Sequence, residues 1–183
     1  YELRRNGVAQ AILKASQEGA TVMGICGGYQ MMGLEVRDPE GVEGNVRMLP
    51  GLGLLPVITT MQGDKVTRQV EFTFDGTEAL CKGYEIHMGR TVPAEGSPPS
   101  PFNQLADGRE EGYQDKQKKC LGTYIHGILD NQPFIDFLLA PYIGKLGQQT
   151  FDYTAFKEEQ YDKLAALVRE HVDMEYIYNS IKN

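Results

Sequence analysis

A cysteine and a histidine stand where this sequence could support nucleophilic chemistry. Residues 24–30 read Gly-Ile-Cys-Gly-Gly-Tyr-Gln, so Cys26 lies between an apolar run and two glycines. This pattern is typical of a nucleophile elbow, in which a strand ends, the chain turns sharply and a helix begins. Small residues suit it, because the nucleophile has a strained backbone and side chains at Gly24 and Gly28 would collide as helix and strand meet. We therefore predict a catalytic thiol at Cys26.

His126 is the best candidate for the base that serves Cys26. It ends the apolar segment 121–126, and a glycine follows it. A thiol–imidazole pair generates the attacking thiolate and later protonates the leaving group. The N–H group of Gly27 would face the oxygen of the tetrahedral intermediate and supply one half of an oxyanion hole. Cys81 and Cys120 lack such a setting, and we interpret both as core residues.

The elements that must position these residues follow from the apolar patterns. Residues 21–26 are apolar and β-branched, which is typical of a strand buried in a parallel sheet. The remaining patterns predict helices at residues 3–15, 29–34, 133–138 and 154–172, strands at 54–61, 65–74, 83–87 and 121–126, and loops at 37–53 and 93–101. Strands interleaved with helices predict an α/β sandwich with a largely parallel central sheet flanked by helices. Functional groups gather at the carboxyl ends of such strands, where Cys26 and His126 both fall.

Composition limits the class of protein. A chain of 183 residues, 41% hydrophobic and 23% charged, fits one globular domain, and no apolar run approaches the ~20 residues that span a bilayer. The net charge of −7 and the scattered 18 Lys and Arg residues argue against a nucleic-acid partner. Three unevenly spaced cysteines give neither a disulfide framework nor zinc-like spacing with the histidines. We expect a reducing, cytoplasmic compartment and no metal.

With these motifs in place, the chain resembles the class I, or triad, glutamine amidotransferases, and within them the branch of the cobyric acid synthases. The elbow at residues 24–30 carries the resemblance, and residues 38–44, 83–91 and 122–127 agree with it in the right order. It implies a flavodoxin-like fold of the class I amidotransferase type. It also implies that Cys26 forms a thioester with glutamine, that ammonia leaves with help from His126, and that water releases glutamate.

The resemblance further implies partners and substrate contacts. In this branch ammonia passes to an ATP-dependent synthetase domain of the same chain, which amidates adenosylcobyrinic acid a,c-diamide in cobalamin biosynthesis. We expect glutamine as the substrate, no cofactor in this domain, and ATP and Mg in the synthetase domain. Gln30 is expected to help hold glutamine, and we add Tyr29 and His87 to the substrate-binding set.

Two departures from the family pattern carry expectations of their own. Most triad amidotransferases have a Glu two residues after the histidine, but Ile128 stands there. We expect Glu85, or a carboxylate of the synthetase domain, to orient His126. We also expect residues 1–183 to form the amidotransferase domain without its N-terminal strand, the loop that supplies the second oxyanion donor, and the upstream synthetase domain. Such a fragment alone would show weak or no glutaminase activity.

Several alternatives stay open. The same chemistry would suit the glutaminase partner of the lipid II amidating enzyme or a cobyrinic acid a,c-diamide synthase. From another class, the chain could be a cysteine-elbow chaperone or redox sensor, which would need neither Gln30 nor a matched His126. An inactive scaffold that docks on a partner would have lost Cys26 or His126, and both are present.

Overall fold

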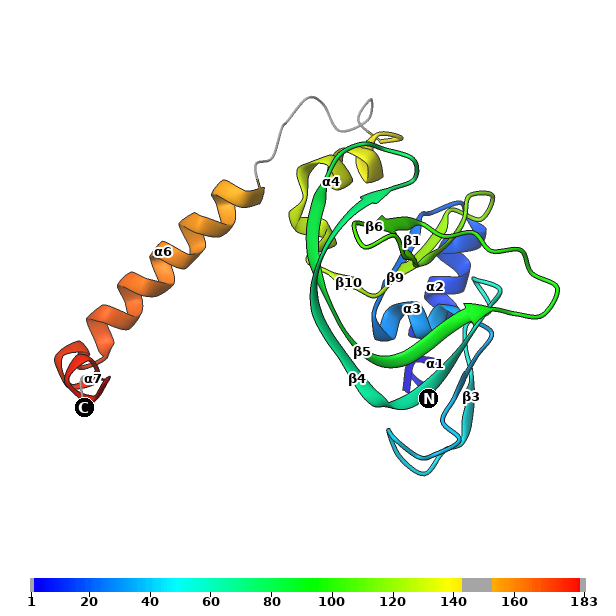
Figure 1. Cartoon of the computed structure of the whole chain (residues 1–183), viewed down its shortest axis with the longest axis horizontal. Helices are drawn as coiled ribbons and strands as arrows, with labels where there is room; N and C mark the ends of the chain where they lie inside the picture. The colour runs from blue at the N-terminus through cyan, green and yellow to red at the C-terminus, as the bar shows by residue number, and fades with distance from the viewer. Residues whose placement is uncertain (1, 143–152, 182–183) are drawn as a thin grey trace. The chain divides into compact units, whose positions relative to one another are not determined.

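The computed structural model describes residues 2–142 and 153–181, and its contacts divide the chain into two units, Tyr1–Phe134 and Ile135–Asn183 (Figure 1). The first unit holds every strand of the described residues and all of the predicted site. Within the described ranges, no helix is both long enough and apolar enough to cross a bilayer.

The first unit opens with two helices, the second of which packs Ile12 and Leu13 against the core cluster. One predicted helix becomes two, α1 (Glu2–Arg5) and α2 (Val8–Gln17), because Gly7 takes a left-handed conformation with φ 83° between them. Strand β1 (Val22–Ile25) follows, and helix α3 (Gly27–Met32) begins almost at once. This order of strand, sharp turn and helix is the one that the sequence predicts.

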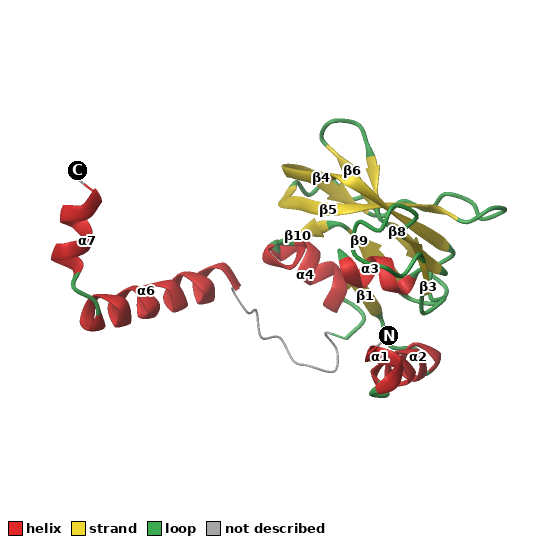
Figure 2. Ribbon diagram, turned by 90° about the horizontal axis from the view of Figure 1, so that it is seen from below, coloured by secondary structure: helices red, strands yellow, loops and turns green. Residues whose placement is uncertain are grey.

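Two sheets organise the unit (Figure 2). In the first sheet, β1 pairs in parallel with β9 (Cys120–Thr123), and β9 pairs antiparallel with β8 (Tyr113–Asp115). The second sheet is built on a long antiparallel hairpin of β4 (Val57–Phe74) and β5 (Cys81–Pro93). Around the hairpin lie the short strands β2 (Glu35–Arg37), β3 (Met48–Pro50), β6 (Asn103–Leu105), β7 (Glu110–Glu111) and β10 (Ile125–His126).

The expected α/β class is confirmed, but the pairing is mixed where we expected it to be largely parallel. Only β1 with β9 and β2 with β4 run parallel among the described strands. The predicted strands 54–61 and 65–74 are one strand, β4, and no helix separates β4 from β5. A parallel pair needs a long crossover connection, so two strands joined by a short turn pair antiparallel.

The predicted strand 121–126 is also divided in two. Its first part, β9, belongs to the first sheet, and its last two residues form β10, which pairs with β5 in the second sheet. Tyr124 lies between them, at the point where the chain changes sheets. A single short junction therefore connects β9, the partner of the nucleophile strand, to the strand that carries the histidine.

Aromatic and aliphatic side chains fill the core beneath the sheets. One cluster joins α3 to the first sheet and contains Tyr29, Met32, Leu54, Leu55, Val57, Tyr113, Cys120 and Tyr124. The 3-10 helix η1 (Ile128–Asp130) is followed by helix α4 (Gln132–Leu139). Phe134, near the start of α4, packs against the rings of Phe74 and Phe102, which also contact each other. Cys81 and Cys120 are buried, which confirms their interpretation as core residues.

A side chain at Gly122 would collide with Tyr29, because a Cβ built there would overlap the tyrosine ring. Replacing Gly122 by alanine is expected to lower the free energy of unfolding by about 3 kcal/mol, the upper part of the usual range for overpacking a core. Urea denaturation of the two proteins measures the difference. Gly63→Ala is the matched control, since a Cβ at Gly63 meets nothing within 4 Å; equal losses in both variants would contradict the steric argument.

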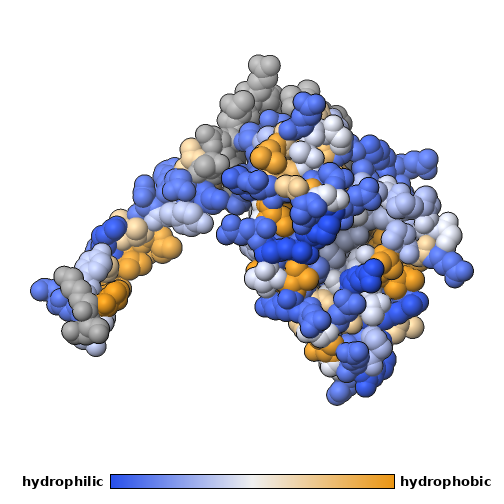
Figure 3. All heavy atoms as spheres, viewed as in Figure 1, coloured by the Kyte–Doolittle hydropathy of each residue, from blue (hydrophilic) through white to orange (hydrophobic). Residues whose placement is uncertain are grey.

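The second unit contains the remainder of α4, helix α6 (Tyr153–His171) and helix α7 (Met174–Ile181). The helix predicted at residues 154–172 is confirmed as α6, whereas α7 was not predicted. Figure 3 shows apolar side chains gathered along one side of α6, and Leu164, Leu167 and Val168 are among its exposed apolar residues.

Candidate active site

Cys26 occupies a strained turn between β1 and α3. Its backbone angles are φ 53° and ψ −114°, a region that residues with a side chain rarely adopt, so the predicted strain is confirmed. The Cys26 N–H donates to the carbonyl oxygen of Thr123 at 2.8 Å, which ties the turn to β9. A Cβ at Gly24 would lie 2.7 Å from the backbone of Gly28, so only glycine lets α3 approach β1. The steric role predicted for Gly28 itself is wrong, because a Cβ there would meet nothing within 4 Å.

A cavity of about 540 Å³ opens beside the start of α3, and Gly27 and Gln30 both line it. Gly27 is the first residue of the helix, so its N–H has no acceptor within the helix. The loop at residues 38–44 forms another part of the lining. The Asp38 carboxylate orders that loop by accepting hydrogen bonds from the N–H groups of Val42 and Glu43, at 2.7 and 2.8 Å. The cavity lining includes Gly27, the neighbour of Cys26, but neither Cys26 nor His126 itself.

Cys26 and His126 both contact strand β5, each from a neighbouring segment. The Cys26 thiol donates to the carbonyl oxygen of Ile86 at 3.5 Å. His126 pairs with Tyr84, two residues earlier in β5, and the two rings stack with centroids 5.1 Å apart. Among the described residues, no hydrogen bond joins the thiol and the imidazole, and the buried Nε2 of His126 has no partner. Catalytic pairs are often loose in unliganded enzymes and tighten when substrate binds.

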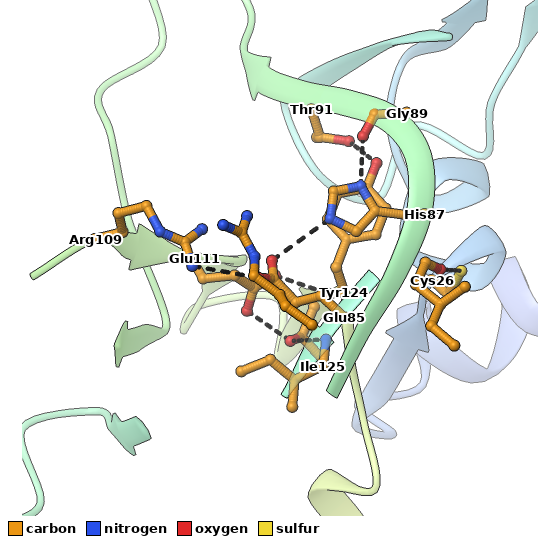
Figure 4. A network of polar contacts seen from close by, with 12 residues as sticks. Cys26, Glu85, His87, Gly89, Thr91, Arg109, Glu111, Tyr124 and Ile125 are labelled. Carbon is orange, nitrogen blue, oxygen red and sulfur yellow. Dashed lines mark hydrogen bonds and ion pairs between the residues drawn. The ribbon is translucent and has the colours of Figure 1, made fainter. Parts of the chain in front are cut away.

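Glu85 is placed against His87 and two arginines, and the structure does not bring it together with His126. Its carboxylate is buried, accepts hydrogen bonds from Arg68 at 2.6 Å and Arg109 at 3.3 Å, and lies 3.4 Å from Nε2 of His87. Figure 4 shows Cys26 on one side of β5 and Glu85 and His87 on the other.

The alternation of side chains along a strand explains this separation. Tyr84, the residue against which His126 stacks, and Glu85 are neighbours, and neighbouring residues of a strand face opposite sides. The expectation that Glu85 orients His126 is therefore corrected: the carboxylate lies on the side of β5 that carries His87 and is held there by the two arginines. The His87 ring also donates from Nδ1 to the Gly89 carbonyl at 2.8 Å.

The charge of Glu85 stabilises the fold in a defined range of pH. Burial by itself raises the pKa of Glu85, but the His87 contact and the two arginines outweigh it and lower the pKa from 4.5 to about 2. The carboxylate therefore contributes its full stability above about pH 4.5, and that contribution is lost as the pH falls toward 2.

Glu85→Gln is expected to remove this part of the pH dependence. The wild-type protein should gain stability over the variant as the pH rises from 2 to 4.5, because only the wild type acquires the paired charge. Urea midpoints measured across that range give the difference. The exposed Glu95→Gln is the control, and a difference between wild type and Glu85→Gln that does not vary with pH would exclude the ion-pair explanation.

The predicted substrate-binding residues divide between two cavities. Gln30 lines the cavity beside Gly27, and its Nε2 donates to the Tyr124 hydroxyl at 3.4 Å. Tyr29 and His87 line a different cavity of about 600 Å³, whose lining shares no residue with the first. Tyr29 is also a core residue, 3% exposed, with its ring edge-on to Tyr124. The arrangement favours Gln30 and not Tyr29 or His87 as a contact for a glutamine held beside Cys26.

Two acidic residues near the site were missed by the sequence reasoning. Asp38 falls in a loop that the sequence predicts, and its position before a proline is a common start of a turn. Glu111 is buried although its neighbour Glu110 is exposed. Nothing in the local sequence separates these two glutamates, because their difference arises from the pairing of distant strands.

Cys26 lies at a strained turn from a parallel strand into a helix. The first N–H of that helix has no acceptor within the helix, and His126 pairs with β5, the strand whose carbonyl accepts the Cys26 thiol. These features define an α/β protein with a cysteine nucleophile elbow. The chain belongs to the family of CobB/CobQ-like glutamine amidotransferase domains, whose family model matches residues 1–134. The matched range coincides with the first structural unit. The expected membership in the glutamine amidotransferases is confirmed.

Two relatives with high sequence identity to this chain are both named cobyric acid synthase. The chain is 66% identical over 178 residues to the cobyric acid synthase of Bacteroides fragilis, which covers 97% of this chain and 36% of that protein. It is 42% identical over 192 residues to the cobyric acid synthase of Syntrophobacter fumaroxidans, covering 96% and 37%. The chain thus spans little more than a third of the length of these relatives. A solved glutamine amidotransferase structure is more distant, with 17% identity, coverage of 75% and 69%, and a TM-score of 0.49.

Proposed function

We propose that this chain hydrolyses glutamine through a thioester on Cys26. The thiolate attacks the side-chain amide carbon, and the new oxyanion accepts a hydrogen bond from the Gly27 N–H. The carbon–nitrogen bond then breaks, and His126 transfers a proton to the departing nitrogen so that ammonia leaves. Water, deprotonated by His126, attacks the thioester, the carbon–sulfur bond breaks, and glutamate is released.

The observation that carries this proposal is the backbone of Cys26, at φ 53° and ψ −114°, on a turn whose next residue lines a cavity. A structural cysteine gains nothing from a strained backbone, whereas a nucleophile gains exposure at the mouth of a site. Gln30 lines the same cavity and is one turn of helix further on. Its side-chain amide is suited to bind a polar substrate.

For the whole protein, we propose cobyric acid synthase activity. The ammonia would pass to an ATP-dependent synthetase domain that amidates adenosylcobyrinic acid a,c-diamide, with ATP and Mg bound in that domain and no cofactor in this one. The names of the relatives and their greater length support this assignment. The three cysteines are free, and we place the enzyme in the cytoplasm.

The test follows nitrogen from donor to product. The complete natural polypeptide, given glutamine labelled with nitrogen-15 in the side-chain amide, ATP, Mg and the diamide, should transfer the label into new amide groups and release glutamate. Glutamate release without transfer would support the glutaminase and reject the corrinoid acceptor. A thiol that ignores glutamine-mimicking electrophiles and reacts instead with peroxide would reject the amidotransferase and favour a redox sensor.

A further inference from the structure

A buried carboxylate binds the junction between β9, which pairs with the nucleophile strand β1, and β10, which carries the histidine. Glu111, in β7, is 7% exposed and receives three hydrogen bonds. Asn103 Nδ2, the Thr123 hydroxyl and the Tyr124 backbone N–H each donate to it at 2.6 Å. Burial raises the pKa of Glu111, although these three donors act in the opposite direction.

The change of sheet explains why a carboxylate is needed there. Tyr124 separates β9 from β10, so its N–H lies between two ladders, and a buried N–H without an acceptor costs free energy. Oε1 of Glu111 accepts this N–H, and Oε2 accepts the Thr123 hydroxyl. The Thr123 oxygen in turn accepts the N–H of Ile125 at 3.0 Å. Glu111 thus binds two successive residues of the junction directly and reaches Ile125 only through the Thr123 hydroxyl; Figure 4 draws this network.

The same junction holds both reacting groups. The Thr123 carbonyl accepts the Cys26 N–H at 2.8 Å, and His126 follows Thr123 by three residues. Any shift of Thr123 moves the turn that carries the thiol, and any rotation at Tyr124 moves the imidazole. Displacements of about 1 Å are enough to cost roughly 100-fold in rate when reacting groups must be aligned.

We propose that Glu111 is a positioning residue that sets the geometry between Cys26 and His126 through Thr123 and Tyr124. It touches neither glutamine nor the reacting atoms. This inference rests on the proposed glutaminase function and adds to it a residue on which the alignment of the pair depends.

The main test is Glu111→Gln in the complete natural polypeptide. A glutamine keeps the size of the side chain but replaces one of the two acceptor oxygens by an NH2 donor, so it cannot accept from Tyr124 at one oxygen and from Thr123 at the other. We expect the kcat of glutamine hydrolysis to fall at least tenfold, the KM for glutamine to stay within twofold, and the reaction driven by free ammonia to be unchanged. Glu110→Gln, the exposed neighbour, is the matched control and should retain wild-type kcat.

A second pair of variants guards against a folding defect at position 111. Thr123→Val removes the hydroxyl with little change of shape and should lower kcat in the same way, whereas Thr123→Ser keeps the hydroxyl and should restore it. The rate of Cys26 alkylation by iodoacetamide across pH is a readout that a purely structural role would not move. We expect the profile to shift in Glu111→Gln and Thr123→Val, and to match wild type in Thr123→Ser.

The outcomes separate the two proposals. Glu111 is not a positioning residue if kcat in the folded variants stays within twofold of wild type. The same conclusion follows if hydrolysis and the ammonia-driven reaction fall by one common factor while the alkylation profile is unchanged. Alkylation requires no turnover, so it tests the positioning role by itself. A wild-type protein that releases no glutamate would instead overturn the proposed function.

Discussion

Replacement of Cys26 by alanine is expected to abolish glutamine hydrolysis, with a loss of at least about 10³-fold in kcat, because no other group can form the thioester. The fold should persist, since alanine removes only a thiol that donates to the Ile86 carbonyl at 3.5 Å. Glutamate release measures the loss. The reaction of the complete polypeptide with free ammonia should remain, because it bypasses the glutaminase site.

Cys81→Ala is the matched control for this experiment. Cys81 is a fully buried core residue in β5, far from the elbow in sequence and without its backbone strain. Its replacement should preserve glutamine hydrolysis with at most a modest loss of stability. If Cys26→Ala still released glutamate, or if Cys81→Ala did not, the assignment of the nucleophile would have to be abandoned.

His126→Asn is expected to lower the kcat of glutamine hydrolysis by about 10²–10⁴-fold, the usual contribution of a general acid–base group. Asparagine can still lie against Tyr84, but it cannot take the thiol proton or protonate ammonia. Steady-state hydrolysis across pH measures the effect.

The control for the histidine is His171→Asn on α6. His171 is exposed and contacts the Leu167 carbonyl of its own helix. Its replacement should leave kcat and the pH profile unchanged. A His126→Asn variant with the activity of His171→Asn would show that another base serves Cys26.

The elbow could be predicted from the sequence because its requirements are local. A strained turn and a close approach of strand and helix demand small residues at fixed spacing, and Gly24 and Cys26 meet that demand within three positions. The buried parallel strand before them was predictable for the same reason, since its apolar run is continuous. His126 could be predicted as the base from its position at the end of an apolar segment and before a glycine.

The partners of Glu85 could not be predicted, because they depend on strand register. The side of β5 that faces His126 is decided by the pairing of Ile125 with Glu85 and of His126 with Tyr84, and the paired residues are 40 and 42 positions apart in the chain. A shift of one residue would exchange the two sides. Tyr29 was misplaced for a related reason: the face of a six-residue helix that turns inward is set by its packing on Gly122, which is distant in sequence.

The change of sheet at Tyr124 makes the spacing of this segment as restrictive as its residue types. An added residue between Tyr124 and His126 would reverse the imidazole to the side of Glu85, and a deleted residue would do the same, because the alternation of a strand has a period of two. Length variation should be tolerated at the exposed turn around Glu95 and Gly96 and forbidden at the four positions from Thr123 to His126. Libraries that randomise this domain should therefore vary side chains there and never chain length.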